Sequence, residues 1–307
     1  MLARLLGKTT KNKSLYKNAE KTVFYLAKTL GERTLREYEN LNQAKEYIKK
    51  ELASLDLTLE EEIYEVKGKK VVNLIGEKKG IEQPEKIIIV GAHYDTVEGT
   101  PGADDNASSI AALLELARLF SELKNKKTIR FVAFTLEEPP FFSTLEMGSM
   151  KYAAQCKDKK ENIELMLCLE MLGFGGKKVK QNFPSSLKKE EVPNQGDFLT
   201  VVSLPSMSDY VYLWEKIYNK KSKKKIFKMI GPASVPGMDL SDHSSFIKYG
   251  YPAIMICDTG FYRNDNYHQV SDTYETINFN FLTENINSTF LTLKEIVNIS
   301  LPSKKKN

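Results

Sequence analysis

The chain has 307 residues, of which 41% are hydrophobic, and a formal net charge of +5 at pH 7. That length can bury the core of one large α/β domain or of two small ones. No stretch reaches the roughly 18 apolar residues that span a membrane. The N-terminal apolar block is too short for a secretory signal, and the cysteines, Cys156, Cys168 and Cys257, follow no paired motif. We therefore expect a soluble cytoplasmic protein in a reducing compartment, with no disulfide framework.

Most of the positive charge is lysine, clustered at 124–127, 223–225 and 304–306. Nucleic-acid binding would require this charge on one face, interleaved with aromatic or arginine side chains. The clusters lack that interleaving and are typical of solvated helix ends and of a tail. We therefore expect neither a nucleic acid nor a membrane as a partner.

Hydrophobic periodicity predicts two helices, then a hairpin, then alternating strands and helices. Gly31 stands where it would cap the first helix. The predicted elements are helices at 15–30 and 41–55, a hairpin at 57–77, strands at 86–93, 128–138, 163–171 and 251–260, and helices at 106–123, 147–156, 209–220 and 283–299.

This alternation predicts an α/β fold with a mixed, mainly parallel central sheet and helices on both faces. The leading hairpin makes the sheet mixed. The chain has no internal repeat and no long linker, so we expect a single catalytic domain over 1–307. In it, residues 1–56 form N-terminal helices that pack on the sheet, and residues 301–307 form a basic tail.

Acidic side chains follow several predicted strands at the point where each strand ends. Asp95 follows the first buried strand, Glu137 and Glu138 end the next, and Glu170 ends the one after. In open α/β sheets, ligands bind outside the carboxyl ends of the strands. Segments far apart in sequence thus deliver carboxylates to one rim.

The three histidines of the chain, His93, His243 and His268, all lie near aspartates. A histidine that binds a metal usually donates its other ring N–H to a carboxylate, and residues two apart on an extended segment point the same way. Each histidine alone is more readily structural than a metal ligand, and a glutamate pair alone is often a solvated loop. Together they favour a metal site, and imidazole and carboxylate ligands suit zinc.

The motifs occur in the order HxD, DD, EE, a lone acid, and YH…DT over residues 70–280. This order resembles the zinc-dependent exopeptidases that include the bacterial co-catalytic zinc aminopeptidases, the glutaminyl cyclases, and the glutamate carboxypeptidase and transferrin-receptor group. The resemblance implies a zinc-exopeptidase (phosphorylase/hydrolase-like) fold and two zinc ions per chain. It also implies the ligands: His93 and Glu170 on one zinc, Glu138 and His268 on the other, and Asp105 bridging both.

The same resemblance implies that Glu137 is the general base and that Asp95 orients His93. It further implies a cis peptide between Asp105 and Asn106. Two departures stand out: Glu170 replaces the aspartate of the best-known aminopeptidases, and "EEPPFF" replaces a small, glycine-containing turn.

Further residues are candidates for substrate contacts. We expect Asp242 and His243 to line the substrate site or to lie just behind the metal ligands. An apolar pocket for the first side chain would be formed by Phe141, Phe142, Met238 and Phe261, for which ordinary core packing is the alternative.

The resemblance implies a metallo-exopeptidase, and we expect an aminopeptidase that hydrolyses N-terminal residues from peptides through a metal-bridged hydroxide. Two alternatives remain. The first is a single-zinc, glutaminyl-cyclase-like acyltransferase, and the second is a catalytically inactive binding homologue.

Overall fold

The computed structural model of the chain describes residues 2–184 and 192–302. It begins with two helices that confirm the first predicted elements. Helix α1 (Leu2–Val23) continues into a π-helical segment, η1 (Phe24–Leu30), and ends at Gly31, whose φ of 75° is the left-handed conformation that favours glycine. Helix α2 (Tyr38–Ala53) follows and buries the predicted apolar face, which includes Leu41 and Ile48.

The centre of the molecule is an eight-stranded sheet with the order β1-β2-β4-β3-β5-β8-β6-β7. Strands β4, β3, β5 and β8 are parallel neighbours, as are β6 and β7, whereas β1–β2, β2–β4 and β6–β8 are antiparallel. The predicted mixed, mainly parallel sheet is therefore confirmed. The strands are β1 (Thr58–Val66), β2 (Lys69–Lys78), β3 (Gln83–His93), β4 (Lys127–Phe134), β5 (Asn162–Glu170), β6 (Phe198–Ser203), β7 (Lys225–Ile230) and β8 (Ala253–Cys257).

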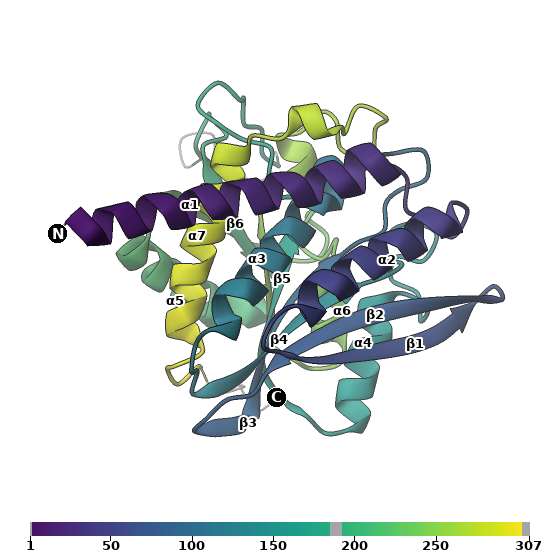
Figure 1. Cartoon of the computed structure of the whole chain (residues 1–307), viewed down its shortest axis with the longest axis horizontal. Helices are drawn as coiled ribbons and strands as arrows, with labels where there is room; N and C mark the ends of the chain where they lie inside the picture. Colours follow the sequence, from purple (N-terminus) through teal and green to yellow (C-terminus); the bar gives the residue numbers. More distant parts are fainter. Residues whose placement is uncertain (1, 185–191, 303–307) are drawn as a thin grey trace.

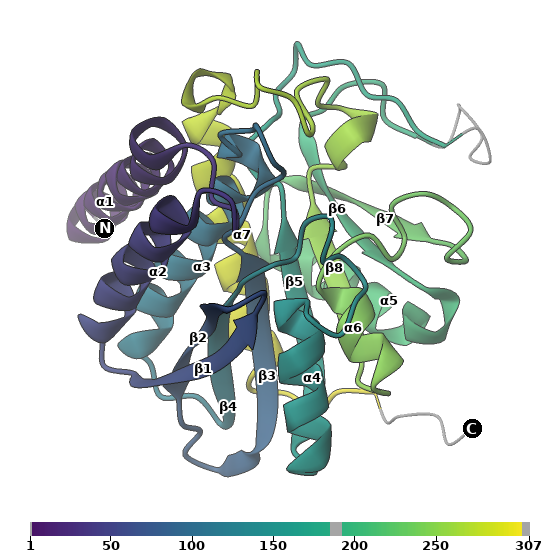
Figure 2. The same cartoon turned by 90° about the vertical axis from the view of Figure 1, so that its right-hand side faces the viewer.

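Helices cover both faces of this sheet (Figure 2). On one face, α2, α3 and α5 contact the strands, α7 packs against α3 and α5, and α1 crosses over α3 and α7 (Figure 1). The other face carries α4 and α6 over a smaller hydrophobic cluster. The remaining helices are α3 (Ser109–Ser121), which continues from the π-helical segment η2 (Ala103–Ser108), α4 (Gly148–Asp158), α5 (Ser208–Lys221), α6 (His243–Lys248) and α7 (Phe279–Ile296).

Several predicted boundaries were wrong. Strand β4 ends at Phe134, so Glu137 and Glu138 lie in the following loop and not at the strand end. Strands β6 and β7 and helix α6 were not predicted. Each of the three spans six residues, which is too short for a clear period. Strand β7 is also a lysine-bearing edge strand that is only partly buried.

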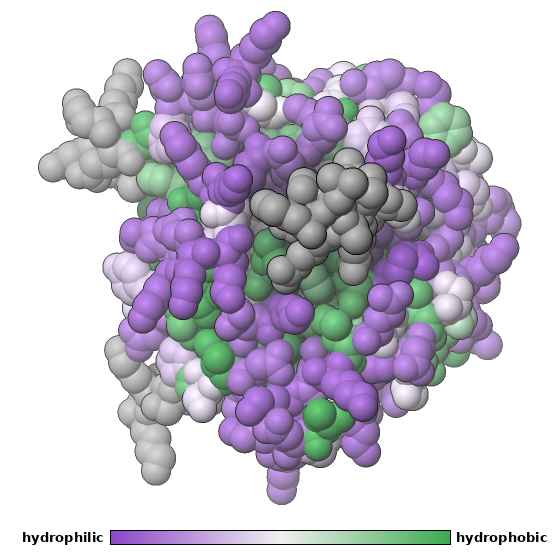
Figure 3. All heavy atoms as spheres, turned by 60° about the vertical axis from the view of Figure 1, so that its left-hand side comes forward, coloured by the Kyte–Doolittle hydropathy of each residue, from purple (hydrophilic) through white to green (hydrophobic). Residues whose placement is uncertain are grey.

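On the face drawn in Figure 3, hydrophilic side chains cover most of the area, and hydrophobic ones show mainly in its middle. Within residues 2–184 and 192–302, no helix combines the length and the apolar character needed to cross a membrane. Of the predicted basic tail, residues 303–307 lie outside the described part of the chain.

One glycine fixes the packing beneath the strand end that carries His93. His93 pairs in register with Phe134, and the Phe134 ring lies against the backbone of Gly91. A Cβ atom at Gly91 would collide with that ring and lie 3.0 Å from the Cε of Met166. Gly91 thus leaves room for an aromatic ring that also packs on Tyr152 and Phe246.

We expect Gly91→Ala to lower the free energy of unfolding by about 1–3 kcal/mol, because the added methyl group overpacks a filled core. Urea unfolding followed by circular dichroism measures this loss. Combining Gly91→Ala with Phe134→Leu should cost less than the sum of the two single losses, because the smaller side chain relieves the collision. Strict additivity would contradict this account of the contact.

Candidate metal centre and adjoining pocket

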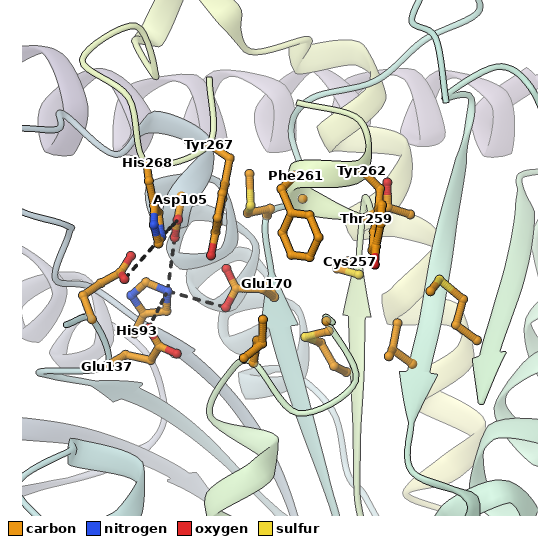
Figure 4. A pocket seen from close by; sticks show the side chains of 18 residues that line it. His93, Asp105, Glu137, Glu170, Cys257, Thr259, Phe261, Tyr262, Tyr267 and His268 are labelled. Carbon is orange, nitrogen blue, oxygen red and sulfur yellow. Dashed lines mark ion pairs between the residues drawn. The ribbon is translucent and has the colours of Figure 1, made fainter. Parts of the chain in front are cut away.

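His93, Asp105 and Glu170 converge at the carboxyl ends of the central strands (Figure 4). His93 ends β3, Glu170 ends β5, and Asp105 lies in the η2 segment that leads into α3. The Nε2 atom of His93 is 3.4 Å from Oδ1 of Asp105 and 3.5 Å from Oε2 of Glu170. The three side chains thus form a first group of potential ligands.

A second group lies on the other side of Asp105. The Nε2 atom of His268 is 3.3 Å from Oδ2 of Asp105 and 3.4 Å from Oε2 of Glu138. Asp105 therefore presents one carboxylate oxygen to each histidine. The structure brings the predicted ligands together in the predicted grouping.

The donor atoms in both groups suit a divalent ion. Two ligands at about 2.0–2.1 Å from a tetrahedral zinc ion lie about 3.3–3.4 Å apart. The separations between each histidine and its carboxylate partners, 3.3–3.5 Å, match this spacing closely. Mixed imidazole and carboxylate donors are also a set that zinc accepts. The residues present therefore fit two such ions.

Glu137 and Glu138 lie in the loop after β4, where the side chain of Asp95 holds their backbone N–H groups. The carboxylate of Asp95 accepts a hydrogen bond from the N–H of Glu137 (3.1 Å) and from the N–H of Glu138 (3.0 Å). Asp95 also lies beside His93, with its Oδ1 3.5 Å and its carbonyl oxygen 3.3 Å from Nδ1. One buried carboxylate thus sets the position of the glutamate pair and faces the ring nitrogen of His93 that points away from the ligand group. Glu137 remains 3.8 Å from Nε2 of His93.

The chain around Asp105 is fixed by a second buried aspartate. Asp272 accepts hydrogen bonds from the N–H groups of both Asp104 (3.0 Å) and Asp105 (3.0 Å). The side-chain oxygen of Asn106 accepts a hydrogen bond from the N–H of Met171 (3.0 Å), which ties this loop to the residue after Glu170. The peptide between Asp105 and Asn106 is cis, as predicted. The role of Asp272 was missed, although it belongs to the DT pair recognised in the sequence.

Arg33 supports the loops that lead to the candidate metal centre. No pattern in the sequence indicated this role. Its guanidinium is fully buried and bonded only to main-chain oxygens. It donates to the carbonyls of Leu26, Gly31, Tyr94, Pro101 and Gly102. It therefore joins the end of the first helical segment to the loops on either side of Asp95.

The concentration of acidic groups shifts the pKa values of the cluster. Burial raises the pKa of Glu137 well above its ordinary value, and burial together with the charge of Asp105 raises that of Glu138 to about 8. Burial alone would lower the pKa of His268, but its bonds to Asp105 and Glu138 raise it to about 10. Burial likewise opposes protonation of His93, whose pKa Glu137 and Glu170 nevertheless raise. Without a cation, protons must neutralise this cluster.

An apolar pocket opens beside the metal centre, on the side of β6, β7 and β8 (Figure 4). Tyr267 stacks on His268, with ring centroids 3.8 Å apart, and its side chain reaches into the pocket. Tyr267 belongs to the YH…DT motif of the sequence, but no role was predicted for it. Unpredicted apolar residues complete the wall, and with the predicted Phe261 they include Met171, Val202, Met229, Leu240, Met255 and Tyr262.

Five other candidates, of which Asp242 and His243 were expected either in the substrate site or just behind the metal ligands, do not line this pocket. None of Phe141, Phe142, Met238, Asp242 and His243 is among the described residues that line this pocket. Met238 is buried and accepts a hydrogen bond through its carbonyl oxygen from His243. Asp242 is fully buried behind the centre, and burial raises its pKa to about 7. Phe141 faces a different pocket. Of the four residues predicted to form an apolar pocket, Phe261 alone is among the described residues that line this one.

Comparisons with known proteins agree with this architecture. A sequence model described as peptidase family M28 matches residues 73–292. An uncharacterised protein of Escherichia coli (strain K12), YfbL, is 36% identical over 269 residues, which cover 85% of this chain and 82% of that protein.

Solved structures share the fold. A zinc aminopeptidase from Bacillus subtilis superimposes with a TM-score of 0.60 at 25% identity, over 76% of this chain and 51% of that one. This chain thus spans about half the length of that structure. A glutaminyl cyclase from Fimbriiglobus ruber superimposes with a TM-score of 0.70 at 18% identity, over 91% of this chain and 94% of that one. At 18% identity, the similarity to the glutaminyl cyclase concerns the fold alone.

We expect the stability of the metal-free protein to fall as the pH rises from 5.5 to 8.0. The pKa of Glu138 is about 8 in the folded chain, against about 4.5 in the unfolded one, so the native state binds more protons in this window. The raised pKa of His268 acts in the same direction, because folded His268 keeps its proton across this window while an unfolded histidine releases its proton above about pH 6.5. The melting temperature in EDTA should drop by at least about 3 °C.

Saturating zinc should remove most of this decline, because a cation takes the place of the protons. In EDTA, Glu138→Gln should show a smaller fall in melting temperature over the same pH range, because the amide does not titrate. A melting temperature that stays constant, or rises, across this range in EDTA would contradict the electrostatic account of the cluster.

Proposed function

The chain belongs to peptidase family M28, and from that membership we propose that it is a two-zinc aminopeptidase that removes single residues from the N-termini of peptides. The proposal has two supports besides the family. The site combines two groups of zinc-compatible ligands, and it has an apolar pocket next to them. The likeness to a zinc aminopeptidase of known structure agrees with this assignment.

The observation that carries the proposal is the orientation of Asp105. Its Oδ1 faces His93 and its Oδ2 faces His268, at 3.4 and 3.3 Å. A carboxylate that serves one ion needs only one such contact. Two contacts, one from each oxygen, suit a bridge between two ions. We assign His93 and Glu170 to one ion and Glu138 and His268 to the other, with Asp105 shared.

When bound, zinc supplies a Lewis acid that lowers the pKa of water toward about 7 and polarises a carbonyl group. The chain itself supplies the proton acceptor. Glu137 is placed by its backbone N–H on Asp95. Burial raises its pKa, as suits a group that must accept a proton near neutral pH and then release it. Glu137 would take a proton from water and deliver it to the leaving amine.

The surroundings of the centre favour the first residue of a peptide. Its carboxylates create a negative field that attracts a protonated α-amine more strongly than a blocked, neutral amide. The pocket walls, which include Met229, Met255 and Phe261, favour an apolar first side chain by removing its surface from water. Tyr267 would stay a neutral hydrogen-bond donor, because burial raises the pKa of its phenol above the ordinary value.

Cyclisation of N-terminal glutamine is the competing activity, because a glutaminyl cyclase shares the fold. The glutaminyl-cyclase-like alternative considered from the sequence uses a single zinc ion. The two faces of Asp105 favour two ions and therefore favour the peptidase. A direct test must nevertheless detect both kinds of product.

We expect zinc-loaded protein, incubated with a mixed peptide pool, to produce ladders that lack successive N-terminal residues. Glu137→Gln should lower this rate by about 10²–10⁴-fold, because the amide cannot accept the proton. Mass spectrometry follows the products, and elemental analysis should give about two zinc ions for both proteins, because Glu137 is not assigned as a ligand. Matched zinc content separates loss of the base from loss of the metal.

Other outcomes would redirect the assignment. Loss of about 17 mass units from glutamine-led peptides, which corresponds to expelled ammonia, would establish the cyclase. Equal cleavage by both proteins would remove Glu137 from its role. An unchanged peptide pool with fully zinc-loaded protein would contradict peptide processing altogether.

A further inference from the structure

A second pocket, of about 300 Å³, lies on the other side of the glutamate pair. Its walls come from the segment between η1 and α2, the turn between β1 and β2, and the loop after β4. The first two segments lie close together at one side of the molecule, to the right in Figure 1. We call this space the lysine pocket, after Lys67 and Lys69 in its wall.

The lysine pocket and the apolar pocket meet at the metal centre. Glu138 lines both of them, and Asp95, which holds Glu138 in place, lines the lysine pocket. The two pockets therefore flank one assigned ligand. A peptide whose first side chain enters the apolar pocket would direct the residue after the scissile bond toward the lysine pocket.

The acidic groups that line the lysine pocket are already engaged. Glu98 pairs with Arg36, Asp95 accepts two backbone N–H groups, and Glu138 faces His268. Each of these carboxylates therefore already has a partner other than the two lysines.

The lysines lack such pairing. Across residues 2–184 and 192–302, neither Lys67 nor Lys69 has a carboxylate within ion-pair distance. The Nζ of Lys67 lies 5.1 Å from the centre of the Phe141 ring. The Nζ of Lys69 donates to the carbonyl of Leu35 (2.6 Å) and lies 5.0 Å from the centre of the Tyr38 ring. These contacts hold both ammonium groups at the pocket wall and leave donor capacity on each.

We propose that the lysine pocket binds a carboxylate on the residue that follows the scissile bond. This inference rests on the proposed aminopeptidase activity and specifies its substrates. Two ammonium groups beside one pocket are a suitable receptor for one carboxylate. The carboxylate has two possible sources: the acidic side chain of a second residue, or the free C-terminus of a dipeptide.

The experiment compares two pairs of substrates with the zinc-loaded full-length protein. Leu-Glu-amide against Leu-Gln-amide tests the side chain, and Leu-Ala against Leu-Ala-amide tests the C-terminus. We expect kcat/KM to be about 5- to 10-fold higher for the carboxylate member of at least one pair, mainly through KM, because the contacts are charged but partly exposed. The pair that shows the preference identifies the source.

The double variant Lys67→Gln/Lys69→Gln should bring that ratio to about 1 and leave the neutral amides unaffected. Lys70→Gln is the matched control, because Lys70 is exposed on the same strand and is not among the residues that line the pocket. It should keep the wild-type ratio. Equal rates within both pairs for the wild type, or a preference that survives in the double variant, would overturn the inference.

A binding measurement separates failure of this inference from failure of the proposed function. Calorimetric titration of Glu137→Gln protein with the same four compounds should show the same preference in Kd. Cleavage without any carboxylate preference in rate or Kd would overturn only the lysine pocket. A lysine-dependent preference in Kd without cleavage of any compound by the wild type would overturn the aminopeptidase and retain the carboxylate pocket.

Discussion

Burial of acidic charge is the constraint on which the rest of this structure depends. Glu137, Glu138 and Asp105 are almost fully buried, and Glu170 is largely so. Buried carboxylates are costly unless they are paired, hydrogen-bonded or bound to a cation. Two imidazoles can offer at most two positive charges to this cluster. The fold meets this constraint in two ways. Backbone N–H groups donate to the aspartates that support the loops, Asp95 and Asp272. The carboxylate oxygens of the candidate ligands lie at distances that suit cations.

The N-terminal segment contributes to this arrangement through Arg33. The peptidase match begins at residue 73, yet Arg33 lies well before it and bonds to loops within it. Burial lowers the pKa of the guanidinium to about 10, although Asp95 and Asp272 oppose this shift. A buried arginine that donates to five carbonyls restrains each of them. The first helices are therefore part of the support of the metal centre and not a separate layer that merely covers it.

The sequence predicted the mixed sheet without β6 and β7 and most helices, because these depend on local patterns that survive folding. Apolar runs such as the one before His93 become central parallel strands. The carboxyl ends of these strands meet at the same edge of the sheet, whatever the lengths of the connecting loops. The grouping of the candidate ligands followed from the resemblance in motif order. The family match confirms the resemblance that the motif order suggested. Pocket walls depend instead on long-range packing. Val202 and Met229 could not be placed without β6 and β7, and Arg33 acts through main-chain oxygens that carry no sequence signal.

The two pockets also differ in which part of the chain builds them. The apolar pocket comes from residues within the matched region 73–292, whereas Lys67 and Lys69 precede it. The loop after Glu138 adds Pro139 and Phe141 to the lysine pocket, at the place where the sequence departs from the small turn expected of the family. A relative can therefore share the ligands and the apolar wall without sharing the basic one. The common core would then determine the hydrolytic reaction. The segments that carry Lys67 and Lys69 would determine which residue is preferred after the scissile bond.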